Sequence, residues 1–141
     1  MPVRELSKKS KYWIPKDRFL ELKHFVRQYD YFKMLRNDIY TCYPTVKYAV
    51  QKGVHVKLSS DPVYSAYARA MTCTKYLVQI EEAFKRVGLN QYNLLYLGIE
   101  QNMSYDVLCA RCSNVPWSRR EYYAKMRQFF WELDQIKMEG D

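Results

Sequence analysis

The side chains best suited to chemistry in this 141-residue chain are cationic and aromatic, and one group of them lies near its C-terminal end. Positions 117 to 127 hold five residues able to contact nucleic acid: Trp117, Arg119, Arg120, Tyr123 and Arg127. Arginine reaches both phosphates and base edges. Because Arg120 and Arg127 are seven residues apart, a helix would place them on one side. The pattern predicts a DNA-binding face. If the partner is a protein instead, the candidate contacts are Arg120, Tyr123, Arg127 and Trp131.

Metal, redox and hydrolytic chemistry find little support in the sequence. Cys109 and Cys112 form one Cys-x-x-Cys pair, whereas a structural zinc site needs four ligands. The other candidate ligands are scattered: His24, Cys42, His55 and Cys73. We interpret Cys109 and Cys112 as small apolar residues on a helix. No Gly-rich phosphate loop, HExxH or Gly-x-Ser-x-Gly occurs. We therefore expect no metal, no cofactor and no enzymatic activity.

The last third of the chain predicts three helices in succession. A short apolar helix ends before Asn102, and Ser104 can cap a two-turn helix over 105–111. A turn over 112–117 follows. Ser118-x-x-Glu121 is a capping box, which predicts the start of a last helix. The apolar stripe of that helix has spacings of three and four and comprises Tyr122, Met126, Phe129, Leu133 and Ile136. Phe130 and Trp131 fall outside this stripe, and exposed rings at these positions suggest a second packing surface on the helix. The arrangement is typical of a helix-turn-helix-like trihelical unit.

A long helix is predicted before this unit. Asp61-Pro62 is a helix start and Gly88 a stop. Between them an apolar seam recurs at alternating spacings of three and four: Val63, Ala66, Ala70, Cys73, Leu77, Ile80, Phe84 and Val87. Such a seam packs either against the other helices of the same chain or against a second copy as a homodimeric coiled coil. The sequence leaves both alternatives open.

These signals predict an all-α fold of five to six helices within a single domain over 1–141. We expect a basic N-terminal arm over 1–14, a helical region over 15–59, a long central helix over 60–88, and the helix-turn-helix-like unit over 89–138. Residues 41–59 are the least regular stretch, because Pro44 and Gly53 interrupt it. The alternating pattern at 54–58 predicts at most a short strand or hairpin.

Charge indicates the class of partner. The chain has 23 Lys and Arg against 15 Asp and Glu, a net charge of +8, and residues 1–36 carry +6 of it. A basic balance favours polyanionic partners, meaning nucleic acid, acidic protein surfaces or membrane headgroups. We expect DNA, with a host protein or ribonucleoprotein as the alternative partner. No apolar run is long enough for a membrane span, and the basic first 13 residues lack the apolar core of a secretory signal. We expect a cytoplasmic protein with reduced thiols.

Three stretches carry a resemblance to known proteins: YWIPKDRFLELKHF at 12–25, SDPV at 60–63, and the aromatic and capping pattern of 103–131. They resemble small phage and prophage proteins of Firmicutes, which are similar to the ArpU/RinA type of phage late-gene transcription regulators. The C-terminal part resembles the DNA-binding region of bacterial sigma factors. The resemblance implies a DNA-binding transcription regulator that works inside a bacterial host cell.

Two alternatives to a DNA-binding regulator follow from the same residues. The chain could be a phage-encoded inhibitor or adaptor that binds a host nucleic-acid-processing protein, for example RNA polymerase or a CRISPR effector nuclease. It could also be a structural or assembly protein that uses the seam helix.

Overall fold

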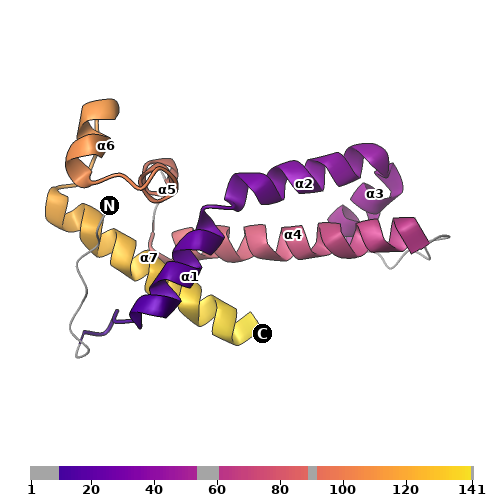
Figure 1. The fold of residues 1–141 in the computed structure, drawn as a ribbon, viewed down its shortest axis with the longest axis horizontal. Helices are drawn as coiled ribbons and strands as arrows, with labels where there is room; N and C mark the ends of the chain where they lie inside the picture. The colour runs from indigo at the N-terminus through magenta and orange to yellow at the C-terminus, as the bar shows by residue number, and fades with distance from the viewer. Residues whose placement is uncertain (1–9, 54–60, 89–91, 141) are drawn as a thin grey trace. The chain divides into compact units, whose positions relative to one another are not determined.

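The computed structural model describes residues 10–53, 61–88 and 92–140, and these residues form helices joined by short connections (Figure 1). No strand occurs among them, which confirms the all-α class. The described helices, seven against the five to six predicted, are α1 (Lys16–Val26), α2 (Tyr29–Cys42), α3 (Pro44–Lys52), α4 (Asp61–Arg86), α5 (Tyr92–Glu100), α6 (Tyr105–Arg111) and α7 (Arg119–Gly140).

Helix α3 corrects the prediction that residues 41–59 are irregular. Pro44 occupies the first turn of α3, where its missing N–H has no partner to lose. Gly53 caps the other end with a φ of 64°, a left-handed conformation that glycine adopts without a side-chain clash. The proline and the glycine therefore mark the two ends of a helix rather than a loop. The predicted strand at 54–58 lies outside the described residues.

The helices gather into two compact units, whereas the length of the chain predicted a single domain. Unit 1 comprises Met1–Arg27 and Gln79–Asp141, and unit 2 comprises Gln28–Val78. Helices α1, α5, α6 and α7 belong to unit 1, and α2 and α3 belong to unit 2. Helix α4 contributes residues to both units.

The core of unit 1 is built around α7. All five residues of its predicted stripe are buried: Tyr122, Met126, Phe129, Leu133 and Ile136. The ring of Phe129 stacks on Phe84 of α4 with 4.2 Å between centroids. The hydroxyl of Tyr122 donates a hydrogen bond to the carbonyl of Met103 at 3.1 Å. That hydroxyl lies against Gly98 of α5, where a Cβ atom would overlap it.

Phe130 lies on the second packing surface that the sequence suggested for the last helix, and this surface is covered. Helix α1 packs against α7, and the two helices cross in Figure 1. Phe19 of α1 meets Phe130 edge to face with 4.8 Å between centroids, so Phe130 is 1% exposed. The packing of α1 therefore gives α7 a second buried side, at one of the two rings that lie outside its apolar stripe.

The core of unit 2 is smaller and joins α2, α3 and the first part of α4. Ile39, Val46, Ala66 and Ala70 form a buried cluster, and half-buried apolar side chains such as Leu35 pack against it. Ala66 and Ala70 belong to the predicted apolar seam of α4, and Phe84 at the other end of the seam packs on α7. Because this chain's own helices cover these seam residues, they form part of its core. A homodimer stays a prediction and would require a different surface.

Candidate nucleic-acid interface

The start of α7 is fixed by the predicted capping box, which the structure confirms. The backbone N–H of Glu121 donates to the hydroxyl of Ser118 at 3.2 Å, and the backbone N–H of Ser118 donates to the Glu121 carboxylate at 3.3 Å. Two donors that a helix end leaves unpaired are thus satisfied. The cap places Arg119 and Arg120 in the first turn of α7.

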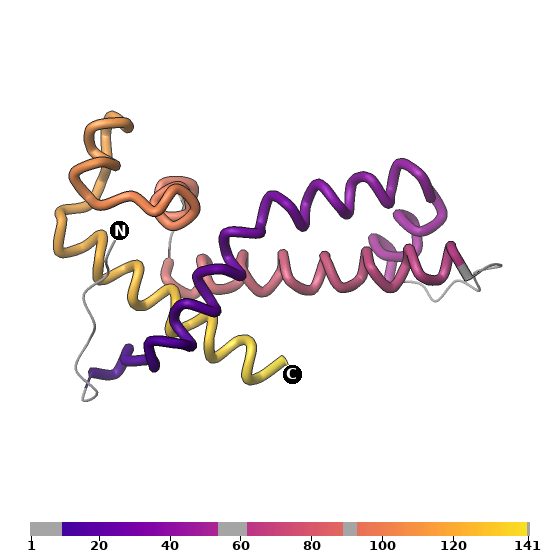
Figure 2. Tube along the Cα trace, viewed as in Figure 1, coloured from indigo at the N-terminus to yellow at the C-terminus, as the bar shows by residue number. Residues whose placement is uncertain are grey.

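Helix α6 is attached to this first turn. Ser104 caps α6 as predicted, because its hydroxyl accepts from the backbone N–H of Val107 at 3.3 Å. The hydroxyl of Tyr105 donates to the carbonyl of Trp117 at 2.6 Å, and the backbone N–H of Tyr105 donates to the hydroxyl of Tyr123 at 3.1 Å. The trace in Figure 2 follows the turn between the two helices. These bonds join the beginning of α6 to the beginning of α7.

Trp117, Arg119 and Tyr123, three of the predicted DNA contacts, take part in this attachment. Trp117 is 7% exposed and packs near Tyr122, so its indole ring faces the core rather than a groove of DNA. Two nitrogens of Arg119 donate to the two carboxylate oxygens of Asp106, at 2.6 and 3.2 Å. These hydrogen bonds raise the pKa of Arg119. Arg119 is exposed, but its guanidinium already has an acidic partner on α6.

Arg120 and Arg127 occupy the side of α7 predicted for them, with different accessibility. Arg120 is exposed, and no other described residue forms a hydrogen bond or ion pair with it. Arg127 is half-buried, and its Nε atom is buried without a hydrogen-bond partner among the described residues. Ala124 lies between them and is exposed. Arg120 is therefore the more accessible of the two cations.

The N-terminal arm reaches the same side of α7 one turn beyond Arg127. Tyr12 meets the ring of Trp131 edge to face at 5.6 Å between centroids. The ammonium of Lys11 lies 5.4 Å from the centre of the Trp131 ring and 5.5 Å from that of Tyr12. Trp131 is consequently half-buried rather than free, and a third cation stands beside the helix.

Together these residues form a strip along α7, which we name the α7 strip: Arg120, Ala124, Arg127 and Trp131, with Lys11 beside Trp131. At 1.5 Å per residue, positions 120 and 131 are about 16 Å apart along the helix. Sequence reasoning missed Tyr105 and Asp106, which hold Trp117 and Arg119. The available signal was the position of Asp106 in the first turn of a helix capped by Ser104, where an acidic residue is favourable.

The cysteine pair lies close to this region. Cys109 is exposed on α6, and Cys112 is half-buried at the C-cap that follows this helix, so only Cys109 lies within a helix as the sequence predicted. Within the part of the chain that the structure describes, no three His, Cys, Asp or Glu side chains stand close enough to hold a metal ion together. His55 lies outside the described residues, and His24 is exposed on α1.

Comparisons with known proteins found no relative of this chain. No protein-family model, no curated protein and no solved structure matches the chain. None of the helices in the described ranges combines the length and the apolar character that a membrane span requires.

Proposed function

We propose that this chain is a DNA-binding transcription regulator that contacts DNA through the α7 strip. The observation that carries the proposal is Arg120, an exposed and unpaired cation in the first turn of a capped helix. Arginine is the side chain most often used for specific major-groove contacts, and a helix N-terminus itself attracts anions. The net charge of +8 supports a polyanionic partner.

The attachment of α6 to α7 supports this proposal in a second way. Hydrogen bonds from Tyr105 and the ion pair between Asp106 and Arg119 hold the first turn of α7 before any partner arrives. A side chain on a held turn loses less conformational freedom on binding than one on a mobile segment. In this proposal Trp117, Arg119 and Tyr123 position the helix, and Arg120, Arg127 and Lys11 touch the DNA.

The test measures binding of Arg120→Ala to fluorescently labelled duplex DNA at two salt concentrations. Loss of a bidentate base contact costs about 1–3 kcal/mol, so affinity should fall between about fivefold and 150-fold. Loss of a phosphate contact alone should reduce the slope of log affinity against log salt by about 1. The duplex pool should include random sequence and the DNA beside the gene that encodes the chain.

The matched control is Lys52→Ala, which removes one positive charge from the exposed end of α3 in unit 2. We expect it to bind DNA nearly as well as the parent. If Arg120→Ala and Lys52→Ala both bind like the parent, the α7 strip does not contact DNA. If both lose the same modest amount, only the net charge matters.

A further inference from the structure

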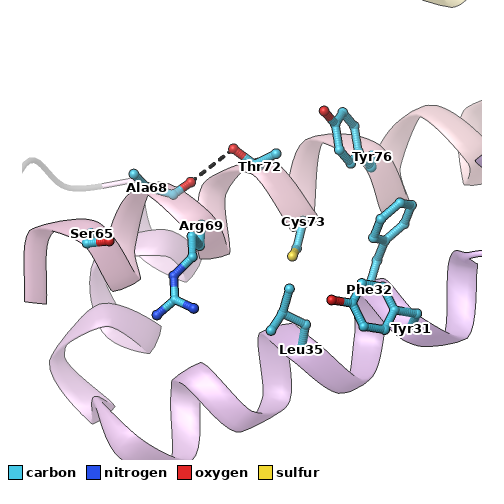
Figure 3. A pocket seen from close by; sticks show the side chains of 9 residues that line it. All are labelled: Tyr31, Phe32, Leu35, Ser65, Ala68, Arg69, Thr72, Cys73 and Tyr76. Carbon is cyan, nitrogen blue, oxygen red and sulfur yellow. Dashed lines mark hydrogen bonds between the residues drawn. The ribbon is translucent and has the colours of Figure 1, made fainter. Parts of the chain in front are cut away.

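Unit 2 contains a groove between α2 and α4, with a volume of about 310 Å³ (Figure 3). Its apolar lining includes Tyr31, Phe32 and Leu35 from α2 and Cys73 and Tyr76 from α4. Phe32 and Tyr76 contact each other with 5.2 Å between ring centroids. Burial raises the pKa of the Cys73 thiol, so this side chain stays neutral. The floor of the groove is therefore apolar and uncharged.

The groove is open because α4 presents small side chains along its edge. Ser65, Ala68 and Thr72 line it at spacings of three and four, which is one helix face. The hydroxyl of Thr72 donates to the carbonyl of Ala68 at 3.0 Å, so its polar atom is satisfied within the helix (Figure 3). Across the groove, Tyr31 remains 53% exposed. A helix bearing larger side chains could fill this space.

The charges around the groove identify the partner more closely. Arg69 is the charged residue in the lining, and none of the described residues pairs with its exposed guanidinium. The segment 28–78 has seven Lys and Arg against three Asp and Glu, which gives unit 2 a net charge of +4. A second copy of this chain would bring the same positive charge and be repelled. An acidic partner is complementary.

We propose that this groove binds an acidic amphipathic helix of a partner protein, whose apolar stripe enters the groove and whose carboxylate pairs with Arg69. No strand edge exists among the described residues of unit 2 that an extended peptide could join. Helix-in-groove recognition instead needs an apolar channel that accepts side chains at positions i, i+3 or i+4, and i+7. The inference does not depend on DNA binding by α7.

The test uses the full chain and two fluorescein-labelled synthetic peptides of equal composition. The first has Leu at every third or fourth position and Glu on its other faces. In the second the same residues are distributed so that no apolar stripe forms. We expect the striped peptide to bind at least about tenfold more tightly, because only its Leu residues lie on one face.

Three variants locate the binding site. Ala68→Trp fills the groove from an exposed position and should weaken binding of the striped peptide by at least about tenfold. Arg69→Glu replaces attraction by repulsion and should weaken it by a similar factor. Lys52→Glu makes the same charge change on α3, outside the groove lining, and should have a much smaller effect. Thermal melting confirms that each variant is folded.

Several outcomes would overturn the proposal. Equal binding of the two peptides would mean that charge alone drives the association. Parent-like binding by Ala68→Trp and Arg69→Glu would place the peptide elsewhere. If light scattering shows a dimer that Ala68→Trp dissociates, a second copy occupies the groove. Arg120→Ala should bind the striped peptide like the parent, so failure of the DNA proposal and failure of this one are distinguishable.

Discussion

Units 1 and 2 are built from the same kinds of residue but use them differently. Unit 1 buries large side chains completely, among them Phe84, Tyr122, Phe129 and Phe130. Of the largest fully buried side chains in the described residues, only Leu77 belongs to unit 2. Unit 2 instead leaves large apolar side chains in contact with solvent: Tyr31, Met34, Tyr48, Tyr64, Met71 and Val78. Among the described residues unit 1 exposes fewer large apolar side chains, namely Leu20, Val107 and Met138, although it is the larger unit.

The net charge is divided equally between the units. By sequence each unit has a net charge of +4, with sixteen Lys and Arg against twelve acids in unit 1 and seven against three in unit 2. Unit 1 pairs some of its arginines: Arg18 contacts Asp134 at 2.6 Å, and Arg86 contacts Glu139 at 3.3 Å. Arg120 of unit 1 and Arg69 of unit 2 are exposed and have no such partner among the described residues. Each unit therefore has an arginine that remains available to a ligand.

The largest expected effect is the loss of a ring from the core of unit 1. Phe129→Ala removes a fully buried side chain that contacts Phe84 and Phe130, and should cost about 3–5 kcal/mol of unfolding free energy. Urea denaturation followed by circular dichroism measures it. The counterpart in unit 2, Val46→Ala, removes two methyl groups and should cost only about 1.6 kcal/mol at about 0.8 kcal/mol each. Equal costs would contradict the contrast between the two cores.

The next effect tests how tightly unit 1 is packed. Gly98→Ala places a methyl group where the Tyr122 hydroxyl lies, and Tyr122 is fully buried and cannot swing into solvent. Overpacking of this kind costs about 1–3 kcal/mol. Thermal melting should show a lower midpoint. Ala68→Gly, at an exposed position inside α4, measures the effect of helix propensity without a change in core packing. An unchanged midpoint for Gly98→Ala would mean that this contact can relax freely.

The sequence predicted those parts of the fold that depend on neighbouring residues. The caps at Ser104 and Ser118 and the α7 stripe are local patterns, and the structure confirms them. The sequence suggested a second packing surface at Phe130 but not what covers it, because the covering ring, Phe19, is more than a hundred residues away. Periodicity within α7 contains no information about that contact.

The candidate site shows the same limit. The sequence identified Arg120 and Arg127 as sharing a side of the last helix, because spacing alone determines that. It could not distinguish Arg119 from Arg120, since only the fold brings Asp106 of α6 to Arg119. The same holds for Lys11, whose place beside Trp131 depends on the docking of Tyr12.

A smaller effect concerns helix capping. Helix α1 of unit 1 and helices α2 and α3 of unit 2 have no side-chain hydrogen bond at their N-caps, whereas Ser118 forms one at the start of α7. Ser118→Ala should therefore cost about 1 kcal/mol, measured by urea denaturation. Ser118→Asp retains an acceptor at the cap and should stay close to the parent. Loss of stability in both variants would argue that the hydroxyl has another role.

The smallest effect on stability at neutral pH comes from the titration of the Tyr122 hydroxyl, which takes place at high pH. Burial, and then the neighbouring Tyr123, raise the pKa of Tyr122 above its usual value of about 10. Above that pH the unfolded chain loses this proton while the folded chain retains it. The free energy of unfolding therefore falls by about 1.4 kcal/mol for each unit that the pH rises. Tyr122→Phe should flatten this decline between pH 10 and 11. An unchanged slope would mean that other groups cause it.

The contact between Gly98 and Tyr122 also limits how this sequence can diverge. A side chain at position 98 and a hydroxyl at position 122 compete for one volume, so the two positions are not independent. A related chain with Ala at 98 should carry Phe or a smaller residue at 122 and satisfy the Met103 carbonyl in another way. Substitutions at positions 98 and 122 should therefore occur together in related chains, whereas the exposed positions of α7 should change independently of one another.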